Sequence, residues 1–163
     1  MAKTVKPVPE GYHTVTPYLV VKDAKRALAY YSKAFGAETK MSMPTPDGRI
    51  MHAEVRIGDS MIFVSDELLD MAPKIKAPES TGGTVTGSIF LYVPDVDVVF
   101  KRAVDAGAEV IMPVTDMFWG DRFGKVVDPF GHHWGIATHK EDVTPQEMEK
   151  RSAEFTRKMT KQK

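Results

Sequence analysis

A short alternating segment holds the residues of this chain that are best suited to acid–base chemistry. Along residues 50–57, His52 and Glu54 alternate with apolar residues, which is the period-two pattern of a strand with one face on a core. A histidine and a glutamate that are neighbours on one strand face can share a proton and act as acid and base. A solvated polar face or a cross-strand pair explains the same pattern, and we favour that interpretation over catalysis while keeping both open.

Other chemistry is excluded by what the sequence lacks. It has no cysteine, which excludes a disulfide scaffold, a zinc–thiolate site and a cysteine nucleophile, and which fits a reducing compartment. It has no glycine-rich phosphate loop, serine elbow, HExxH pair or zinc-finger spacing. Lys plus Arg and Asp plus Glu number 22 each, so no net charge attracts nucleic acid or an anionic membrane.

The size of the chain predicts one domain. Its 163 residues, 42% of them hydrophobic, are enough to fill one core. Residues 1–12 lack the apolar centre of a signal peptide, and no run approaches the ~18 apolar residues of a membrane span. We therefore expect a cytoplasmic protein with neither membrane nor nucleic acid among its partners.

The first half of the chain predicts the element order βαβββ. Residues 14–21 are rich in β-branched and aromatic types, as strands are, and Asp23 caps a helix over residues 24–35 that Gly36 ends. Its apolar residues recur at three- and four-residue spacing, which predicts one buried stripe. Further strands are expected at residues 37–43, 50–57 and 61–65.

The second half repeats this order. Residues 88–93 predict a strand, and Asp95 caps a helix over residues 96–106. The turn glycine Gly58 of the first half corresponds to Gly131 of the second, and matching pairs lie 71 to 73 residues apart. Such a constant offset favours an internal duplication.

Two segments lie outside the repeat. Residues 67–83 mix Pro, Gly, Ser and charges without a period, which predicts a linker or mobile surface loop. Residues 144–160 predict a very polar C-terminal helix. We expect a single domain over residues 1–163, with module one at about 12–66 and module two at about 84–140.

Several runs give the chain a family resemblance. They are residues 30–36 (YYSKAFG), 117–125 (MFWGDRFGK), 128–134 (DPFGHHW) and 137–139 (ATH). Together with the two βαβββ modules, they resemble the vicinal oxygen chelate superfamily of glyoxalases, bleomycin resistance proteins and extradiol dioxygenases, in particular its PhnB-like branch. The resemblance covers residues 12–142 and implies an α+β fold whose modules form a cupped mixed β-sheet, here followed by a C-terminal helix, commonly in a homodimer.

The resemblance also locates a metal site. In metal-using members, the first and last strands of each module each supply one ligand. The matching positions in this chain are Thr16, Ile62, Ser88 and Gly135. None offers the imidazole or carboxylate that divalent catalytic metals need, so we expect no metal or other cofactor in the usual site. A slip of two residues in the alignment would admit His52, Glu54 or His133 as ligands.

The resemblance assigns further residues to the cup. Those expected to line it are Thr16, Tyr18, His52, Glu54, Ile62, Ser88, Phe90, Trp119, Lys125 and Gly135. Hydroxyls and rings together suit a neutral, partly aromatic ligand. Lys125 lies where related phosphonate-binding members present a pocket residue and can hold an anionic group, although an exposed strand lysine fits equally. Arg122 is expected to pair with Asp121.

Strand alternation places the remaining candidates. Trp134 and Ile136 alternate away from Gly135 and are expected to pack under a helix. The histidines expected at the surface or in turns are His13, His132 and His139.

Three hypotheses of function follow. The first is a metal-independent protein that binds a small organic molecule in the cup. The second is an enzyme, either a metal-dependent lyase or dioxygenase with displaced ligands, or a metal-free acid–base catalyst that uses His52 and Glu54. The third is a structural dimerisation module whose cavity is filled by side chains. A fold does not fix function. We favour the first hypothesis because all four positions expected to bind a metal lack a donor side chain.

Overall fold

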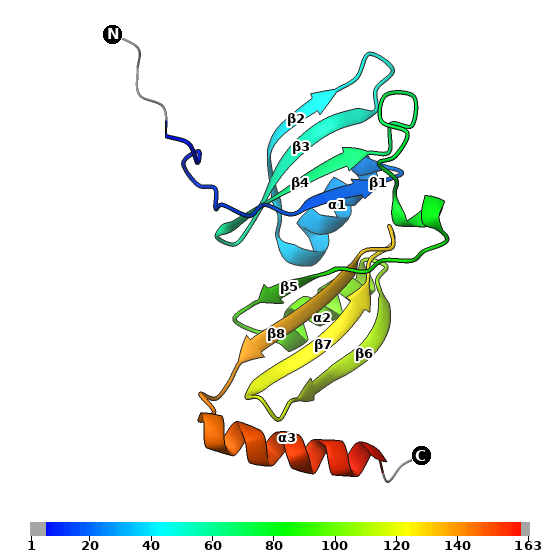
Figure 1. Cartoon of the computed structure of the whole chain (residues 1–163). Helices are drawn as coiled ribbons and strands as arrows, with labels where there is room; N and C mark the ends of the chain where they lie inside the picture. Colours follow the sequence, from blue (N-terminus) through cyan, green and yellow to red (C-terminus); the bar gives the residue numbers. More distant parts are fainter. Residues whose placement is uncertain (1–5, 161–163) are drawn as a thin grey trace.

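The computed structural model describes residues 6–160, which form two βαβββ modules and a last helix (Figure 1). Module one consists of β1 (Tyr18–Val21), α1 (Ala24–Phe35), β2 (Glu38–Pro44), β3 (Ile50–Ile57) and β4 (Ser60–Asp66). Module two consists of β5 (Ser88–Tyr92), α2 (Val96–Asp105), β6 (Glu109–Asp116), β7 (Asp121–Val127) and β8 (His133–His139). Between them lies the 3-10 helix η1 (Pro78–Thr81), and the helix α3 (Pro145–Thr160) follows module two. The predicted α+β fold is confirmed.

Each module has its own mixed four-stranded sheet, and the two sheets have the same topology. Their strand orders are β1-β4-β3-β2 and β5-β8-β7-β6, with the first pair of each sheet parallel and the rest antiparallel. In module one Tyr18 pairs with Phe63, and in module two Phe90 pairs with Gly135. Both members of the second pair lie 72 positions after those of the first. The internal repeat predicted from the sequence is therefore present in the strand register.

The helices begin and end where the sequence predicts. The Asp23 side chain accepts a hydrogen bond from the backbone N–H of Arg26 at 3.0 Å, and Asp95 accepts one from Val98 at 3.2 Å, so each satisfies an otherwise free donor of the first turn. Gly36 ends α1 with a φ of 68°, which a side chain would strain. These local contacts fix where each helix starts relative to its sheet.

A second contact ties each helix start to the last strand of its module. Asp66 accepts hydrogen bonds from the backbone N–H of Ala24 at 2.7 Å and of Ile50 at 2.5 Å. Seventy-two positions later, the hydroxyl of Thr138 accepts from the N–H of Val96 at 2.8 Å. The repeat thus keeps this contact while changing its residue from a carboxylate to a hydroxyl.

The modules join on their helix sides around a buried carboxylate. Asp128 accepts hydrogen bonds from the Tyr31 hydroxyl of α1 and from the indole N–H of Trp134, both at 2.9 Å. It also accepts from the backbone N–H groups of Phe130 and His132. Tyr31 and Trp134 are fully buried, and one hydrophobic core runs through both modules. Trp134 therefore packs under a helix, as predicted.

This packing leaves one face of each sheet uncovered by its helix. We call the sheet surface opposite α1 or α2 the open face of that module; in the view of Figure 1 both helices lie behind their sheets. Exposed aromatic side chains lie there, among them Tyr18, Phe90 and Tyr92. The sheet orders show that the two sheets are not joined by strand pairing.

The structure corrects two expectations about irregular segments. The first strand begins at Tyr18 rather than at residue 14, because Pro17 has no N–H to donate to a ladder. The segment 67–83 is not a free linker. The Glu67 carboxylate accepts hydrogen bonds from the N–H of Ala77 at 2.7 Å and from the Ser80 hydroxyl at 2.8 Å, which closes the segment into a loop.

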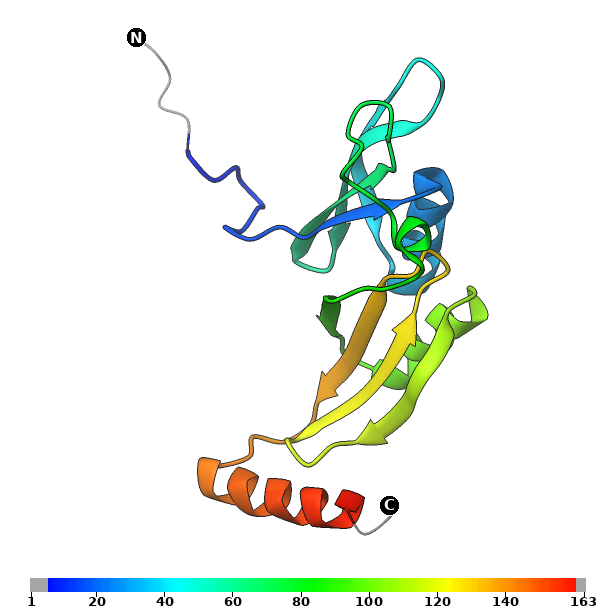
Figure 2. The same ribbon diagram turned by 45° about the vertical axis from the view of Figure 1, so that its right-hand side comes forward.

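The helix α3 lies across the end of module two that faces away from module one (Figure 2). None of its residues is buried. Phe155 contacts Phe118 at a ring distance of 5.2 Å, and Arg151 pairs with Glu141 at 2.8 Å. Within residues 6–160, no helix is long and apolar enough to cross a bilayer.

Candidate functional site

The predicted acid–base pair lies on the open face of module one. His52 Nε2 and Glu54 Oε1 are 3.8 Å apart, so strand alternation placed both side chains correctly. Both groups also have tyrosine partners. The Tyr18 hydroxyl lies 3.1 Å from His52 Nδ1, and the Tyr12 hydroxyl donates to Glu54, which raises the pKa of Tyr12 to about 12. His52 and Glu54 thus form part of a hydrogen-bonded cluster.

An aromatic ring completes this cluster. The Phe63 ring lies 4.8 Å from the His52 ring and 5.6 Å from the Tyr18 ring, in both cases edge to face. Such contacts hold the polar side chains against the sheet. The polar side chains on the open face of module one are therefore packed against aromatic rings and bonded to one another.

A bulge in β3 brings a further residue to this face. Simple alternation predicts that Met51 points to the core with Ala53. The pairing with β2 shifts between Met43, which lies opposite His52, and Pro44, which lies opposite Ile50. The extra residue reverses the alternation, so Ile50 is buried and Met51 is exposed.

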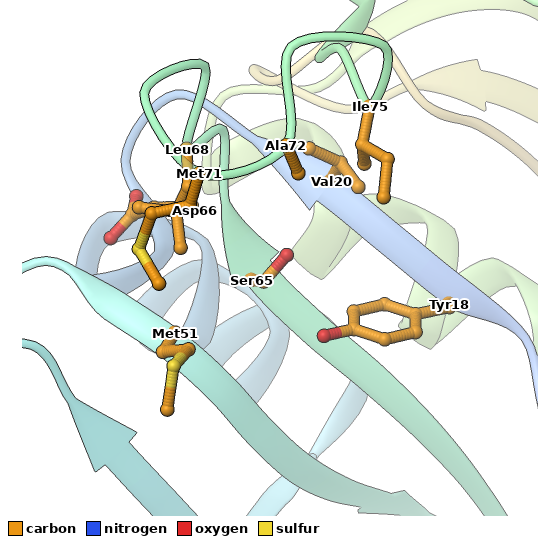
Figure 3. A pocket seen from close by; sticks show the side chains of 9 residues that line it. All are labelled: Tyr18, Val20, Met51, Ser65, Asp66, Leu68, Met71, Ala72 and Ile75. Atoms are coloured by element: carbon orange, nitrogen blue, oxygen red, sulfur yellow. The ribbon is translucent and has the colours of Figure 1, made fainter.

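Met51 lines a pocket at one end of the open face (Figure 3). The pocket has a volume of about 520 Å³, which is within the range of small-molecule sites. The sheet contributes Tyr18, Val20, Met51, Ser65 and Asp66, and the loop after β4 contributes Leu68, Met71, Ala72 and Ile75. In Figure 3 the side chains of the loop extend over those of the sheet.

The loop over the pocket, residues 67–77, is held at both ends and in the middle. Glu67 closes its ends through Ala77, as described above. At its centre Asp70 receives two hydrogen bonds from the Arg49 guanidinium, at 2.8 and 2.9 Å, and this pairing lowers the pKa of Asp70 to about 2. Leu68 is buried beneath the loop. The loop thus forms a wall of the pocket.

The interior of the pocket offers no charge to a ligand. The carboxylate of Asp66 is already bonded to the backbone N–H groups of Ala24 and Ile50. The hydroxyls of Tyr18 and Ser65 are its other polar side-chain groups, and the remaining lining is apolar, with two polarizable methionines. Such a lining suits an uncharged, mostly apolar molecule that carries one or two hydrogen-bonding groups.

A larger groove of about 700 Å³ lies between the modules. Its lining includes Pro17 and Ile89, the neighbours of Thr16 and Ser88, so side chains do not fill the space beside these positions. The groove also has Asp59 and the helix residue Arg102 in its lining. The lining of the groove thus mixes charged and apolar residues, whereas the lining of the pocket under the loop is mostly apolar.

The open face of module two carries the other predicted residues. Phe90 and Phe123 stack with their rings 5.3 Å apart and 4° from parallel. They cover Gly135, where an added Cβ would lie 2.9 Å from each ring. Lys125 lies on the same face, in register with Gly135, as alternation predicted. Phe123 was not among the predicted residues, although its parity with Lys125 was the signal that would have found it.

One prediction about the 119–122 segment is wrong, and another stays a prediction. Arg122 pairs not with Asp121 but with Asp97 of α2, through two hydrogen bonds of 2.8 Å, and with Asp116 at 3.2 Å. Side chains alternate along β7, so Arg122 points toward α2 and Asp121 points to the open face. The indole N–H of Trp119, predicted to contact a ligand, donates to Asp121 at 2.9 Å.

The structure also corrects one of the four positions of this chain that were matched to the family's metal ligands. Ile62 is buried on the helix side, so its assignment to the cup was wrong. The register pairs Tyr18 with Phe63 and Phe90 with Gly135, which makes Phe63 the counterpart of Gly135. The count from the turn glycine failed because β3 and β4 are joined by a shorter turn than β7 and β8.

The corrected positions do not fit a metal. Thr16 and Ser88 bear hydroxyls, Phe63 bears a ring and Gly135 bears no side chain, so none supplies an imidazole or carboxylate. Across residues 6–160, no three His, Asp or Glu side chains converge in a way that could hold a metal ion. We therefore derive no chemistry through a metal at this site.

Comparison with known proteins identifies the family. The glyoxalase/bleomycin resistance protein/dioxygenase superfamily matches residues 12–136. An uncharacterized protein of Mycobacterium tuberculosis is 42% identical over 136 residues, which are 83% of this chain and 79% of that protein.

Solved structures share the fold. The crystal structure of TioX from Micromonospora sp. ML1 is similar with a TM-score of 0.60 and 26% identity, over 78% of this chain and 98% of that one. A PhnB protein from Bacillus cereus shares the fold with a TM-score of 0.58 at 16% identity, over 77% of this chain and 99% of that one. The chain belongs to the glyoxalase/bleomycin resistance protein/dioxygenase superfamily.

Proposed function

We propose that this protein binds a small, uncharged organic molecule in the pocket between the open face of module one and the loop 67–77. The observation that carries the proposal is the pocket itself, with an apolar lining, two hydroxyls and a fully engaged carboxylate. Apolar surface supplies the affinity and a few placed polar groups supply the orientation, as in other small-molecule sites. Binding at this place needs no metal, because no residue of the lining depends on one.

The methionines allow a direct test. With 13C-methyl-labelled methionine, titration with 2-naphthol, a neutral aromatic probe, should shift the signals of Met51 and Met71 in the pocket. The signal of Met159 on the exposed face of α3 should stay unchanged and serves as an internal control. Equal shifts at all three residues would indicate nonspecific association and would overturn the proposal.

A matched pair of variants tests the site whatever the affinity of the probe. Ala72→Phe places a ring in the pocket and should abolish the shifts at Met51. Ala153→Phe introduces the same ring on the exposed surface of α3 and should leave them as in the parent protein. Binding that survives Ala72→Phe would contradict the proposed site.

We also propose a homodimer in which the open faces of the two copies face each other and enclose the ligand sites between them. The support is the exposure of Phe90 and Tyr92 on a sheet face that no element of the same chain covers, since contiguous exposed apolar surface marks interaction sites. Sedimentation equilibrium should show a dimer for the parent protein and a monomer for Phe90→Asp. Phe155→Asp on α3 introduces the same charge elsewhere and should remain a dimer. A monomeric parent protein would refute this assembly.

The enzyme hypothesis retains one specific observation, the His52–Glu54 contact of 3.8 Å. We propose it as the second candidate. It requires the Tyr12 hydroxyl to leave Glu54, because that hydroxyl occupies the carboxylate oxygen that would otherwise accept a substrate proton. Tyr12→Phe should then raise the rate of any turnover found, while His52→Gln should abolish it. An activity indifferent to both variants would exclude the acid–base role.

A further inference from the structure

At the far end of the open face of module two, three strands and a turn bring polar side chains together at Asp121. This carboxylate is only 4% exposed. Its Oδ2 accepts hydrogen bonds from the Tyr92 hydroxyl at 3.0 Å and the Trp119 indole at 2.9 Å, and its Oδ1 lies 2.8 Å from His139 Nδ1. Because an ionised carboxylate only accepts hydrogen bonds, His139 Nδ1 must donate. Asp121 thus fixes the orientation of the His139 ring.

The other ring nitrogen has a different kind of partner. His139 Nε2 lies 2.9 Å from a carboxylate oxygen of Asp142, so it also donates and the ring is an imidazolium. The hydrogen bond to Asp121, and then that to Asp142, raise the pKa of His139. Asp121 is buried, whereas the Asp142 side chain is fully exposed on the segment between β8 and α3. Of the two carboxylates, Asp142 is the one that a solute can replace.

An aromatic surface adjoins this cation. The Tyr92 ring lies 5.0 Å from the Phe90 ring, which in turn stacks on Phe123. Phe90 and Tyr92 are 46% and 66% exposed, so their rings are accessible. Tyr92 and His139 are both bonded to Asp121, and Phe123 pairs with Ala137, which lies two residues before His139 on β8. An exposed aromatic surface, with the Phe90 and Tyr92 rings inclined at 52°, therefore lies on the same face as an oriented, charged hydrogen-bond donor.

We propose that this end of the open face is a binding site for aromatic carboxylates. The ligand's carboxylate takes the place of the Asp142 side chain on His139 Nε2, and its ring lies against Phe90 and Tyr92. Asp142 is then an internal competitor that imitates the ligand's anionic group. The site differs in place and in charge preference from the neutral pocket of module one, so either proposal can fail without the other.

The test uses benzoate as the probe at a pH near 6, where the imidazolium predominates. Benzoate should shift the imidazole signals of His139 in a saturable way, and its neutral analogue benzamide should not. Removing the internal competitor with Asp142→Asn should strengthen benzoate binding about two- to sixfold, the range expected when an exposed ion pair of ordinary strength no longer has to be displaced. His139→Gln should weaken binding at least about tenfold, since it removes the charge-assisted bond.

Asp105→Asn is the matched control, since it removes one exposed, ion-paired carboxylate from the end of α2, on the covered side of the sheet, and should leave the affinity unchanged. Asp142 is fully exposed, so its variant does not depend on refolding of a core. The proposal is overturned if Asp142→Asn and Asp105→Asn bind benzoate equally, or if His139→Gln binds it as the parent does. Shifts at Met51 in place of His139 would assign benzoate to the module one pocket and equally refute this site.

Discussion

Replacing Asp66 with alanine tests whether the pocket really contains no available charge. The carboxylate is buried and accepts from two buried backbone donors, the N–H groups of Ala24 and Ile50. A buried donor left without a partner costs about 1–3 kcal/mol, and removal of the buried carboxylate offsets part of that cost. We expect Asp66→Ala to lower the free energy of unfolding by about 2–4 kcal/mol.

The repeat supplies the control for this variant. Thr138 takes the place of Asp66 in module two: its hydroxyl accepts from one backbone donor, the N–H of Val96, and donates to the carbonyl oxygen of Val93. Thr138→Val keeps the shape of the side chain and should cost about 1–2 kcal/mol, clearly less than Asp66→Ala. Urea unfolding followed by tryptophan fluorescence and by circular dichroism measures both values. A loss below about 1 kcal/mol for Asp66→Ala, or one no larger than for Thr138→Val, would mean that Asp66 is not held by the backbone and that its charge faces the pocket.

Three further predictions concern other contacts of the molecule. Gly120→Ala should cost about 2–4 kcal/mol of unfolding free energy in a urea titration, because at its φ of 99° the new Cβ would lie 2.2 Å from the Glu141 carbonyl oxygen; a stability unchanged from the parent would contradict the geometry. Pairing with Asp121 and Asp142 raises the pKa of His139 above its ordinary 6.5. The contribution of His139 to stability is therefore fully present below about pH 6.5 and is lost as the pH rises through the raised value. Urea midpoints measured across this range should show the loss in the parent and not in His139→Gln. Arg49→Gln releases Asp70 and should speed limited proteolysis within residues 67–77 while the urea midpoint stays nearly constant, and equal cleavage rates would show that the ion pair does not hold the loop.

Most of the fold follows from local patterns in the sequence. The caps Asp23 and Asp95 and the apolar spacing of the helices depend on neighbouring residues, and the structure has them as predicted. The same is true of strand parity, which placed His52, Glu54 and Lys125 on the open faces. These features could be predicted because each is decided within about one turn or one strand.

The site depends on features that local patterns do not decide. The bulge that turns Met51 outward arises from pairing with β2, which the sequence of β3 does not contain. The slip that assigned Ile62 to the cup came from a difference in turn length between the repeats. Asp121 and His139 are cross-strand partners, and the sequence around His139 by itself predicts only a surface residue. For Met51 and His139 the deciding contact joins different strands, whereas for Ile62 the turn lengths of the two repeats had to be known.

Gly135 bears on how readily substitutions could install a metal site in this chain. A glutamate there would have to displace both the Phe90 and the Phe123 ring, since even a methyl group meets them at 2.9 Å. A lone substitution would thus first disrupt the aromatic stack and gain nothing, because Thr16, Phe63 and Ser88 would still lack donors. A metal site here would therefore require several coordinated replacements, each unfavourable without the others.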